Sequence, residues 1–205
     1  MKQSDTIEKT AAALAAGKPV VFPTDTVYGI GVAVGLAKTP QVLFDIKRRD
    51  ADKAIPWLVG KKSALSLYGR DVPAYALAAA EAYWPGPLTL IVKAAANVPE
   101  AFRAENGTIA LRMPDDPVAL ALIDRVGFPL ATSSANFQGE HPAHTFDEVD
   151  SALVGLVAAA LGDGSPRSGI SSTVVDCTGS RPFVLRRGAV TEKQLLELAE
   201  DRPAQ

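Results

Sequence analysis

Apolar residues occur along this chain in two patterns, as short continuous runs and at the spacing of an amphipathic helix. Short runs rich in Val, Ile and Leu predict buried strands, which we place at residues 19–22, 55–59, 88–92, 109–113, 129–132, 172–176 and 183–186. Between these runs, apolar residues at helical spacing predict helices over 74–83 and 116–126. Strands that alternate with helices in this way predict one α/β layered domain with a mixed sheet.

Helix-start signals predict further elements. A polar residue followed three positions later by Glu or Gln has the pattern of a capping box, found at Asp5 with Glu8, Thr145 with Glu148, and Thr191 with Gln194. We expect the first of these helices to end at Gly17 and the second to run until the glycine-rich stretch 162–169. Thr39 and Pro40 predict another helix, which ends at the basic cluster 47–49.

The composition narrows the class of protein. With 205 residues, of which 47% are hydrophobic and 21% charged, the chain is typical of a single globular domain over 1–205. Its net charge of −2 argues against a globally basic nucleic-acid binder, although a local basic patch is compatible with it. Cys177 is the only cysteine, which excludes an intramolecular disulfide. Since no signal peptide or membrane-spanning run is apparent, we expect a cytoplasmic protein without a membrane partner.

Two polar segments follow apolar elements in the first quarter of the chain. The segment 23–29, with the sequence PTDTVYG, offers hydroxyl and carboxylate groups either to a small polar ligand or to its own backbone. Lys47, Arg48, Arg49 and Lys53 place four cations within seven positions. Cations at a helix C-terminus also complement the helix dipole, so both phosphate binding and a solvated helix end are open readings.

Further candidates lie at the ends of later strands. Thr108 and Arg112 share one face of a predicted strand, and an arginine among apolar residues needs an anionic partner, either a structural Asp or a ligand. Hydroxyl-rich or amide-bearing segments occur at 133–136 and 171–173, and basic residues precede a glycine at 185–188. Each has a plain explanation as a turn cap or a protected edge strand. Together they predict a ligand site, because open α/β sheets bind ligands at strand ends.

Two other patterns predict no site. In 31–39 the lysine does not directly follow the second glycine, so the segment is not a phosphate-binding P-loop. His141 and His144 have no evident third partner, and we expect no protein metal site there. The chain also lacks the Gly-x-Ser-x-Gly elbow of serine hydrolases.

Taken in order, several of these segments resemble the motifs of one family. They are PTDTVYG, the Lys47-x-Arg49 pair with Lys53, WPGPLT, TIALRMP, SSAN, STVVD and LRRG, and they resemble the YrdC/TsaC family of threonylcarbamoyl-AMP synthases. The resemblance runs from about residue 20 to residue 188 and includes the order of the motifs. It implies a single YrdC-like domain of the short form, with a twisted mixed sheet around a concave basic cavity.

The resemblance implies a role for each matching residue. Threonine would be bound by Thr26, Arg112, Ser134 and Ser172. The ATP side would consist of Arg49, Lys53, Thr108, Asn136, His144 and Arg186. The family's characteristic set, assigned to catalysis, corresponds to Lys47, Arg49, Ser134 and Asn136. Two positions depart from the family pattern, because His144 stands where relatives often have a small hydroxyl residue, and Leu58 where some longer relatives have a histidine.

The resemblance also implies a reaction. L-threonine, bicarbonate or CO₂, and ATP would be joined into L-threonylcarbamoyl-adenylate by a nucleotidyltransferase, for the modification of tRNA position 37. The threonine carbamate would attack the α-phosphorus and release pyrophosphate, with Mg²⁺ and the site's cations offsetting the triphosphate charge. Expected partners are tRNA or double-stranded RNA and a downstream threonylcarbamoyl transferase complex. The alternatives are a YciO-like paralogue without this activity and a double-stranded RNA-binding protein, whose binding would weaken steeply with salt.

Overall fold

The computed structural model describes residues 4–48 and 55–200. Its strands are β1 (Val20–Phe22), β2 (Gly29–Ala33), β3 (Trp57–Leu58), β4 (Gly69–Arg70), β5 (Leu88–Ala94), β6 (Thr108–Arg112), β7 (Leu130–Ser134), β8 (Ala159–Ala160), β9 (Thr173–Asp176) and β10 (Phe183–Arg186). The α-helices are α1 (Ile7–Ala15), α2 (Gln41–Lys47), α3 (Ala64–Tyr68), α4 (Ala74–Tyr83), α5 (Pro117–Val126), α6 (Ser151–Val154) and α7 (Glu192–Glu200), with short 3₁₀ helices η1 (Glu100–Phe102) and η2 (Phe146–Glu148).

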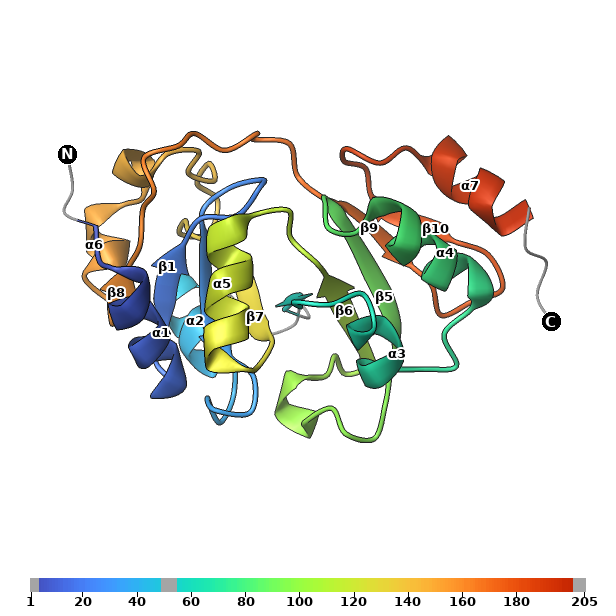
Figure 1. Cartoon of the computed structure of the whole chain (residues 1–205), viewed down its shortest axis with the longest axis horizontal. Helices are drawn as coiled ribbons and strands as arrows, with labels where there is room; N and C mark the ends of the chain where they lie inside the picture. Colours follow the sequence, from blue (N-terminus) through green and yellow to red (C-terminus); the bar gives the residue numbers. More distant parts are fainter. Residues whose placement is uncertain (1–3, 49–54, 201–205) are drawn as a thin grey trace.

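All strands of this part of the chain join one mixed ten-stranded sheet, which confirms the predicted α/β class. Its order is β10-β9-β5-β6-β3-β7-β2-β1-β8, and β4 pairs with β5 off this path. Figure 1 shows α1 and α5 beside β1 and β7 in one half of the molecule, and α4 and α7 beside β5 and β9 in the other. The segment between β8 and β9 crosses from one half to the other along the top of that view.

One central strand of the sheet was not predicted. β2 pairs antiparallel with both β1 and β7, with Gly31 opposite Val20 on one side and Thr132 on the other. Its sequence, GIGVA, reads as a glycine-rich loop. In the structure these glycines allow close packing, because a Cβ added to Gly31 would lie 2.9 Å from the carbonyl oxygen of Ala131.

The helix-start predictions have mixed outcomes. The pair Thr191 and Gln194 is confirmed, since the backbone N–H of Thr191 donates to Gln194 Oε1 at 2.9 Å and the N–H of Gln194 donates back to Thr191 Oγ1. The Asp5 cap is wrong: the N-cap of α1 is Thr6, whose hydroxyl accepts the N–H of Lys9. Asp5 instead accepts the backbone N–H of Ala160 at 2.8 Å, and so attaches the start of the chain to β8.

The capping box at Thr145 and Glu148 is present, but the long helix predicted after it is wrong. The box opens only the single turn η2. Asp150 then caps the four-residue helix α6 by accepting the N–H of Ala152, and the chain enters the edge strand β8 beside β1. A cap pattern marks where a helix starts but does not determine its length.

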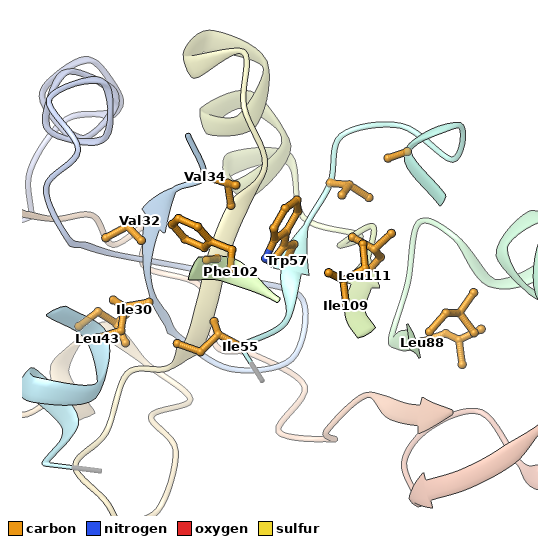
Figure 2. Packing of buried hydrophobic residues seen from close by; sticks show 14 of the residues in the cluster. Ile30, Val32, Val34, Leu43, Ile55, Trp57, Leu88, Phe102, Ile109 and Leu111 are labelled. Atoms are coloured by element: carbon orange, nitrogen blue, oxygen red, sulfur yellow. The ribbon is translucent and has the colours of Figure 1, made fainter. Parts of the chain in front are cut away.

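Two apolar clusters lie on opposite faces of the sheet. Because successive strand residues point to opposite faces, Val21 enters the larger cluster while Phe22 enters the smaller one, which packs under α1 and α5. In the larger cluster the Trp57 ring meets the Phe102 ring edge-on, with the centroids 6.1 Å apart (Figure 2). Leu58, the next residue after Trp57, points into the smaller cluster.

In the described ranges, 4–48 and 55–200, none of the helices has the length and apolar character needed to cross a lipid bilayer.

Candidate functional site

A cavity of about 510 Å³ opens over the sheet between the two halves of the molecule. Leu58 both lines it and belongs to the cluster under α5, so the cavity begins where that helical layer ends. The described lining contains two arginines, Arg112 and Arg186, and no acidic residue. The remaining polar lining residues are the hydroxyl-bearing Thr24, Thr26, Thr89, Thr132, Ser133, Ser134, Ser171 and Ser172. This lining agrees with the expected concave basic cavity and suits an anionic, hydrogen-bonding ligand.

The loop between β1 and β2 forms one wall of the cavity and holds Arg112. Nη1 of Arg112 donates to Thr26 Oγ1 at 3.1 Å, Nη2 donates to Asp25 Oδ1 at 2.5 Å, and Nε donates to the carbonyl of Gly86. Burial lowers the pKa of Arg112, although the charge of Asp25 acts in the opposite direction. The anionic partner that the sequence requires for Arg112 is therefore Asp25 in this structure.

Arg186, the last residue of β10, also lines the cavity. Its guanidinium donates to the carbonyl of Ser172 at 2.9 Å and to the hydroxyl of the same residue at 2.9 Å. The Ser172 hydroxyl also lies 2.9 Å from Thr89 Oγ1. Partial burial of the guanidinium and the nearby charge of Arg112 both lower the pKa of Arg186. Among the described residues no carboxylate forms an ion pair with Arg186, so its charge is available to a ligand.

Lys47 is not among the residues that line the cavity, where a phosphate-binding lysine would be expected. It ends α2 with only 4% of its surface exposed, and its Nζ donates to the carbonyls of Ser134 at 2.5 Å and Asn136 at 2.6 Å. The amide of Asn136 in turn donates to the carbonyls of Phe137 and Glu140. Lys47 and Asn136 thus shape the loop after β7 and fix Ser134 at the cavity wall.

Other predicted site residues lie outside the cavity lining. The hydroxyl of Thr108 donates to Asn106 Oδ1 at 2.7 Å. His144 is exposed, and its ring packs against Gly169, where an added Cβ would collide with it. Arg49 and Lys53 lie outside the described residues. The structure therefore brings Thr26, Arg112, Ser134, Ser172 and Arg186 together around one cavity.

A charged cluster fixes the segment that crosses between β8 and β9. Arg167, whose side chain is 7% exposed, pairs with Asp116 at 2.7 Å and also with Asp163. Its guanidinium lies 5.6 Å from the centre of the Tyr28 ring. Within residues 4–48 and 55–200, no group of three or more His, Cys, Asp or Glu side chains is arranged to hold a metal ion.

Sequence reasoning missed several lining residues. Thr89 and Thr132 sit inside strands, where hydroxyl residues are usually explained by strand propensity, and Leu185 belongs to the exposed edge strand β10. Thr89 lies between Leu88 and Leu90, and this alternation is the one signal that could place it on the cavity face. Asp25 was part of a candidate loop, but its pairing with Arg112 spans 87 positions and has no local signal.

The comparisons with known proteins agree with this geometry. A family model for Sua5, YciO and YrdC, described as telomere recombination, matches residues 12–188. The threonylcarbamoyl-AMP synthase of Bacillus subtilis is 35% identical over 201 residues, covering 92% of this chain and 55% of that protein.

Solved structures show the same fold. Sua5 of Pyrococcus abyssi, crystallised with L-threonine, matches with a TM-score of 0.86 and 31% identity, covering 94% of this chain and 56% of that one. YciO of Escherichia coli matches with a TM-score of 0.82 and 26% identity over 93% and 92% of the two chains. This chain thus spans about half the length of the Bacillus and Pyrococcus relatives. On the strength of the family match over most of its length, the chain belongs to the Sua5/YciO/YrdC family.

Proposed function

We propose that this protein is an L-threonylcarbamoyl-adenylate synthase, a nucleotidyltransferase that uses L-threonine, bicarbonate or CO₂, and ATP. The observation that carries the proposal is one cavity lined by Arg112, Arg186 and eight hydroxyl-bearing side chains. Relatives named threonylcarbamoyl-AMP synthase support it, as does the L-threonine complex of Sua5. The product would serve the modification of tRNA at position 37.

The amino-acid end of the proposed site is built around Arg112. Its guanidinium can bind the threonine carboxylate through two parallel N–H groups. Thr26, at 3.1 Å from Nη1, and the hydroxyls of Ser134 and Ser172 line the same cavity and can bind the remaining polar groups of the substrate. All four residues were assigned to threonine from the sequence.

The nucleotide end would lie toward Arg186. The carbamate formed from threonine and bicarbonate has an oxygen that can attack the α-phosphorus of ATP, and the bond to pyrophosphate then breaks. No nucleophilic side chain is required, since positioning and charge neutralisation suffice. Arg186 would offset phosphate charge, and Lys47 would act by fixing the Ser134 and Asn136 loop. Roles for Thr108, Asn136, His144, Arg49 and Lys53 toward ATP remain part of this proposal.

Mg²⁺ would enter this site together with ATP. A magnesium ion can be held by phosphate oxygens and water, with few protein ligands. The described residues form no cluster of three or more metal-ligating side chains, which fits an ion that arrives on the substrate. When bound, it would offset the charge of the triphosphate.

The partners of the proposed enzyme follow from its product. An acyl-adenylate of this kind is unstable in water and needs an acceptor, so we propose a downstream threonylcarbamoyl transferase complex that acts on tRNA. The alternative function is direct binding of tRNA or double-stranded RNA to the positively charged cavity. RNA binding would weaken steeply with salt and would not depend on threonine.

A pyrophosphate-release assay tests the proposal. The purified protein is incubated with ATP and Mg²⁺, and threonine and bicarbonate are omitted in turn. We expect release of pyrophosphate only when all components are present. Release that does not need threonine, or no release at any concentration, would instead favour the YciO-like paralogue.

A further inference from the structure

Arg167 lies in the segment that crosses between β8 and β9, residues 161–172, which we call the crossing segment. Its Nη1 donates to Asp116 Oδ2 at 2.7 Å, and Asp116 is the N-cap of α5. Its Nη2 donates to Asp163, and its Nε donates to the carbonyl of Ser165 at 3.1 Å, both within the crossing segment. Because the Arg167 side chain is only 7% exposed, these bonds are shielded from water. Arg167 thus attaches the crossing segment to the start of α5.

The same guanidinium packs against the loop between β1 and β2. It lies 5.6 Å from the centre of the Tyr28 ring, in a cation–π contact. Tyr28 closes the loop that carries Thr26, and Asp116 follows shortly after Arg112, the last residue of β6. Arg167 therefore contacts both the loop of Thr26 and the chain that leads away from Arg112. These two residues, both assigned to threonine, hydrogen-bond each other at 3.1 Å.

The two residues after Arg167 hold the tip of the β1–β2 loop. The hydroxyl of Ser168 donates to the carbonyl of Asp25 at 2.8 Å, and the N–H of Gly169 donates to the carbonyl of Thr26 at 2.9 Å. A shift of the crossing segment would therefore move the backbone of Thr26, and with it the hydroxyl that lines the cavity. Arg167 opposes such a shift, because its guanidinium is bound on the far side to α5.

The part of the cavity near Arg186 is held by other bonds. The N–H of Thr173, at the start of β9, donates to the carbonyl of Pro87 at 2.9 Å. The guanidinium of Arg186 donates to the carbonyl and the hydroxyl of Ser172. These bonds join β9 and β10 to the chain that enters β5, in the other half of the sheet. Loss of the Arg167 contacts should therefore disturb the threonine end of the cavity and leave the Arg186 end in place.

We propose that Arg167 is a positioning residue for threonine binding. By joining the crossing segment to α5, it holds Thr26 at the distance from Arg112 at which one ligand can bind both side chains. It acts through these residues, since Arg167 itself does not belong to the described cavity lining. The inference rests on the proposed function, because it concerns the amino-acid end of that site. It adds a buried contact outside the cavity to the residues assigned above.

Calorimetric titration of the full chain tests this inference with two ligands, added separately. One is L-threonine and the other is ATP with Mg²⁺, and bicarbonate is left out so that no turnover occurs. In Arg167→Met we expect the Kd for threonine to rise by about tenfold, while the Kd for ATP stays within about twofold of the wild-type value. Arg167→Lys should restore part of the threonine affinity, because lysine keeps the charge but lacks the forked donors that reach two carboxylates.

A milder variant and a matched control accompany these substitutions. Ser168→Ala removes the hydrogen bond to the carbonyl of Asp25 at an exposed position, and we expect the Kd for threonine alone to rise by about threefold. Arg125→Met is the control. It also removes an arginine–carboxylate pair of α5, the one with Glu8 at 3.3 Å, but the Arg125 side chain is 49% exposed. Both Kd values should stay at the wild-type level in this variant.

Equal losses of threonine and ATP affinity in Arg167→Met would show a purely structural role and overturn the inference. A folded Arg167→Met that binds threonine like the wild type would overturn it too. If removal of the buried charge prevents folding, Ser168→Ala decides, and unchanged threonine affinity in that variant refutes the inference. None of these results alters the pyrophosphate assay of the wild type. A failure of that assay, with threonine affinity that still depends on Arg167, would refute only the proposed function.

Discussion

The Arg186 guanidinium donates two hydrogen bonds to the carbonyl oxygen of Ser172, at 3.1 and 2.9 Å, and a third to its hydroxyl. This contact joins the edge strand β10 to the start of β9 and places a positive charge at the cavity wall. Because Ser172 is neutral, it orients the guanidinium without cancelling its charge. Arg112, neutralised by Asp25, differs from Arg186 in this respect.

Replacement of Arg186 should weaken ATP binding more than threonine binding. We expect Arg186→Met to raise the KM for ATP by about tenfold or more, since hydrogen bonds to charged groups contribute about 1.5–3 kcal/mol. Steady-state kinetics with each substrate varied would measure this, and Arg186→Lys should restore part of the loss. Arg187→Met is the control, because that side chain is 87% exposed. An unchanged KM for ATP in Arg186→Met would contradict the assignment.

Lys47 should matter for stability as well as for activity. Lys47→Met removes the donor to two backbone carbonyls, and we expect the free energy of unfolding to fall by about 2 kcal/mol. Threonine affinity should fall too, because the carbonyl that Lys47 holds belongs to Ser134. Denaturant unfolding and threonine titration would check both effects. Lys38→Met, at an exposed position, should behave like the wild type. A Lys47→Met variant as stable as the wild type would contradict the stabilising role of the Lys47 hydrogen bonds to Ser134 and Asn136.

Gly188 is required for the cavity wall because its missing side chain leaves room for the backbone of 171–173. A Cβ there would collide with the carbonyl of Ser171 and lie 2.5 Å from the backbone nitrogen of Thr173. Since backbone cannot move aside cheaply, Gly188→Ala should displace Ser172 and raise the KM values for threonine and for ATP by about tenfold, the equivalent of ~1.4 kcal/mol. Gly179→Ala, whose nearest neighbour would be 3.9 Å away, should have no effect.

The crossing segment should respond to acid through Asp163. Burial acts to raise the pKa of Asp163, but the hydrogen bonds from Arg167 and from the N–H of Ser165, together with the charge of Arg167, outweigh burial, so the pKa in the folded protein lies below the ordinary value of 3.8. A lowered carboxylate pKa adds stability above the unfolded-state value and loses it as the pH falls through the folded-state value.

Asp163→Asn should therefore lower the free energy of unfolding by about 1 kcal/mol at neutral pH. The difference from the wild type should shrink as the pH falls below 3.8. Urea unfolding at a series of pH values would show this, with the exposed Asp115→Asn as a control. A difference that grows toward acid pH would mean that Asp163 does not stabilise the folded protein through its charge.

Much of the fold could be read from local patterns. The helix at Ala74–Tyr83 has the predicted bounds, and the strands at 88–92 and 183–186 appear close to where the apolar runs place them. These elements have strong periodicity and turn residues at their ends. β2 was missed because its glycines look like a loop, and only the packing against Ala131 explains them.

Less of the candidate site could be predicted from local sequence patterns. Arg112 could be recognised as needing an anionic partner, but the choice of Asp25 depends on strands far apart in the chain. In the local pattern Lys47 is one of four neighbouring cations, and only the family resemblance sets it apart; its burial against Ser134 is a tertiary contact. Such distinctions depend on tertiary contacts, which a single sequence does not reveal.

The central claim is that this cavity joins threonine, bicarbonate and ATP. The most direct measurement is mass spectrometry of the product formed from ATP, Mg²⁺, L-threonine and ¹³C-bicarbonate. We expect threonylcarbamoyl-adenylate that carries the ¹³C label, in an amount equal to the pyrophosphate released and greatly reduced in Arg112→Ala. Pyrophosphate or AMP without a labelled threonine adduct would contradict the account.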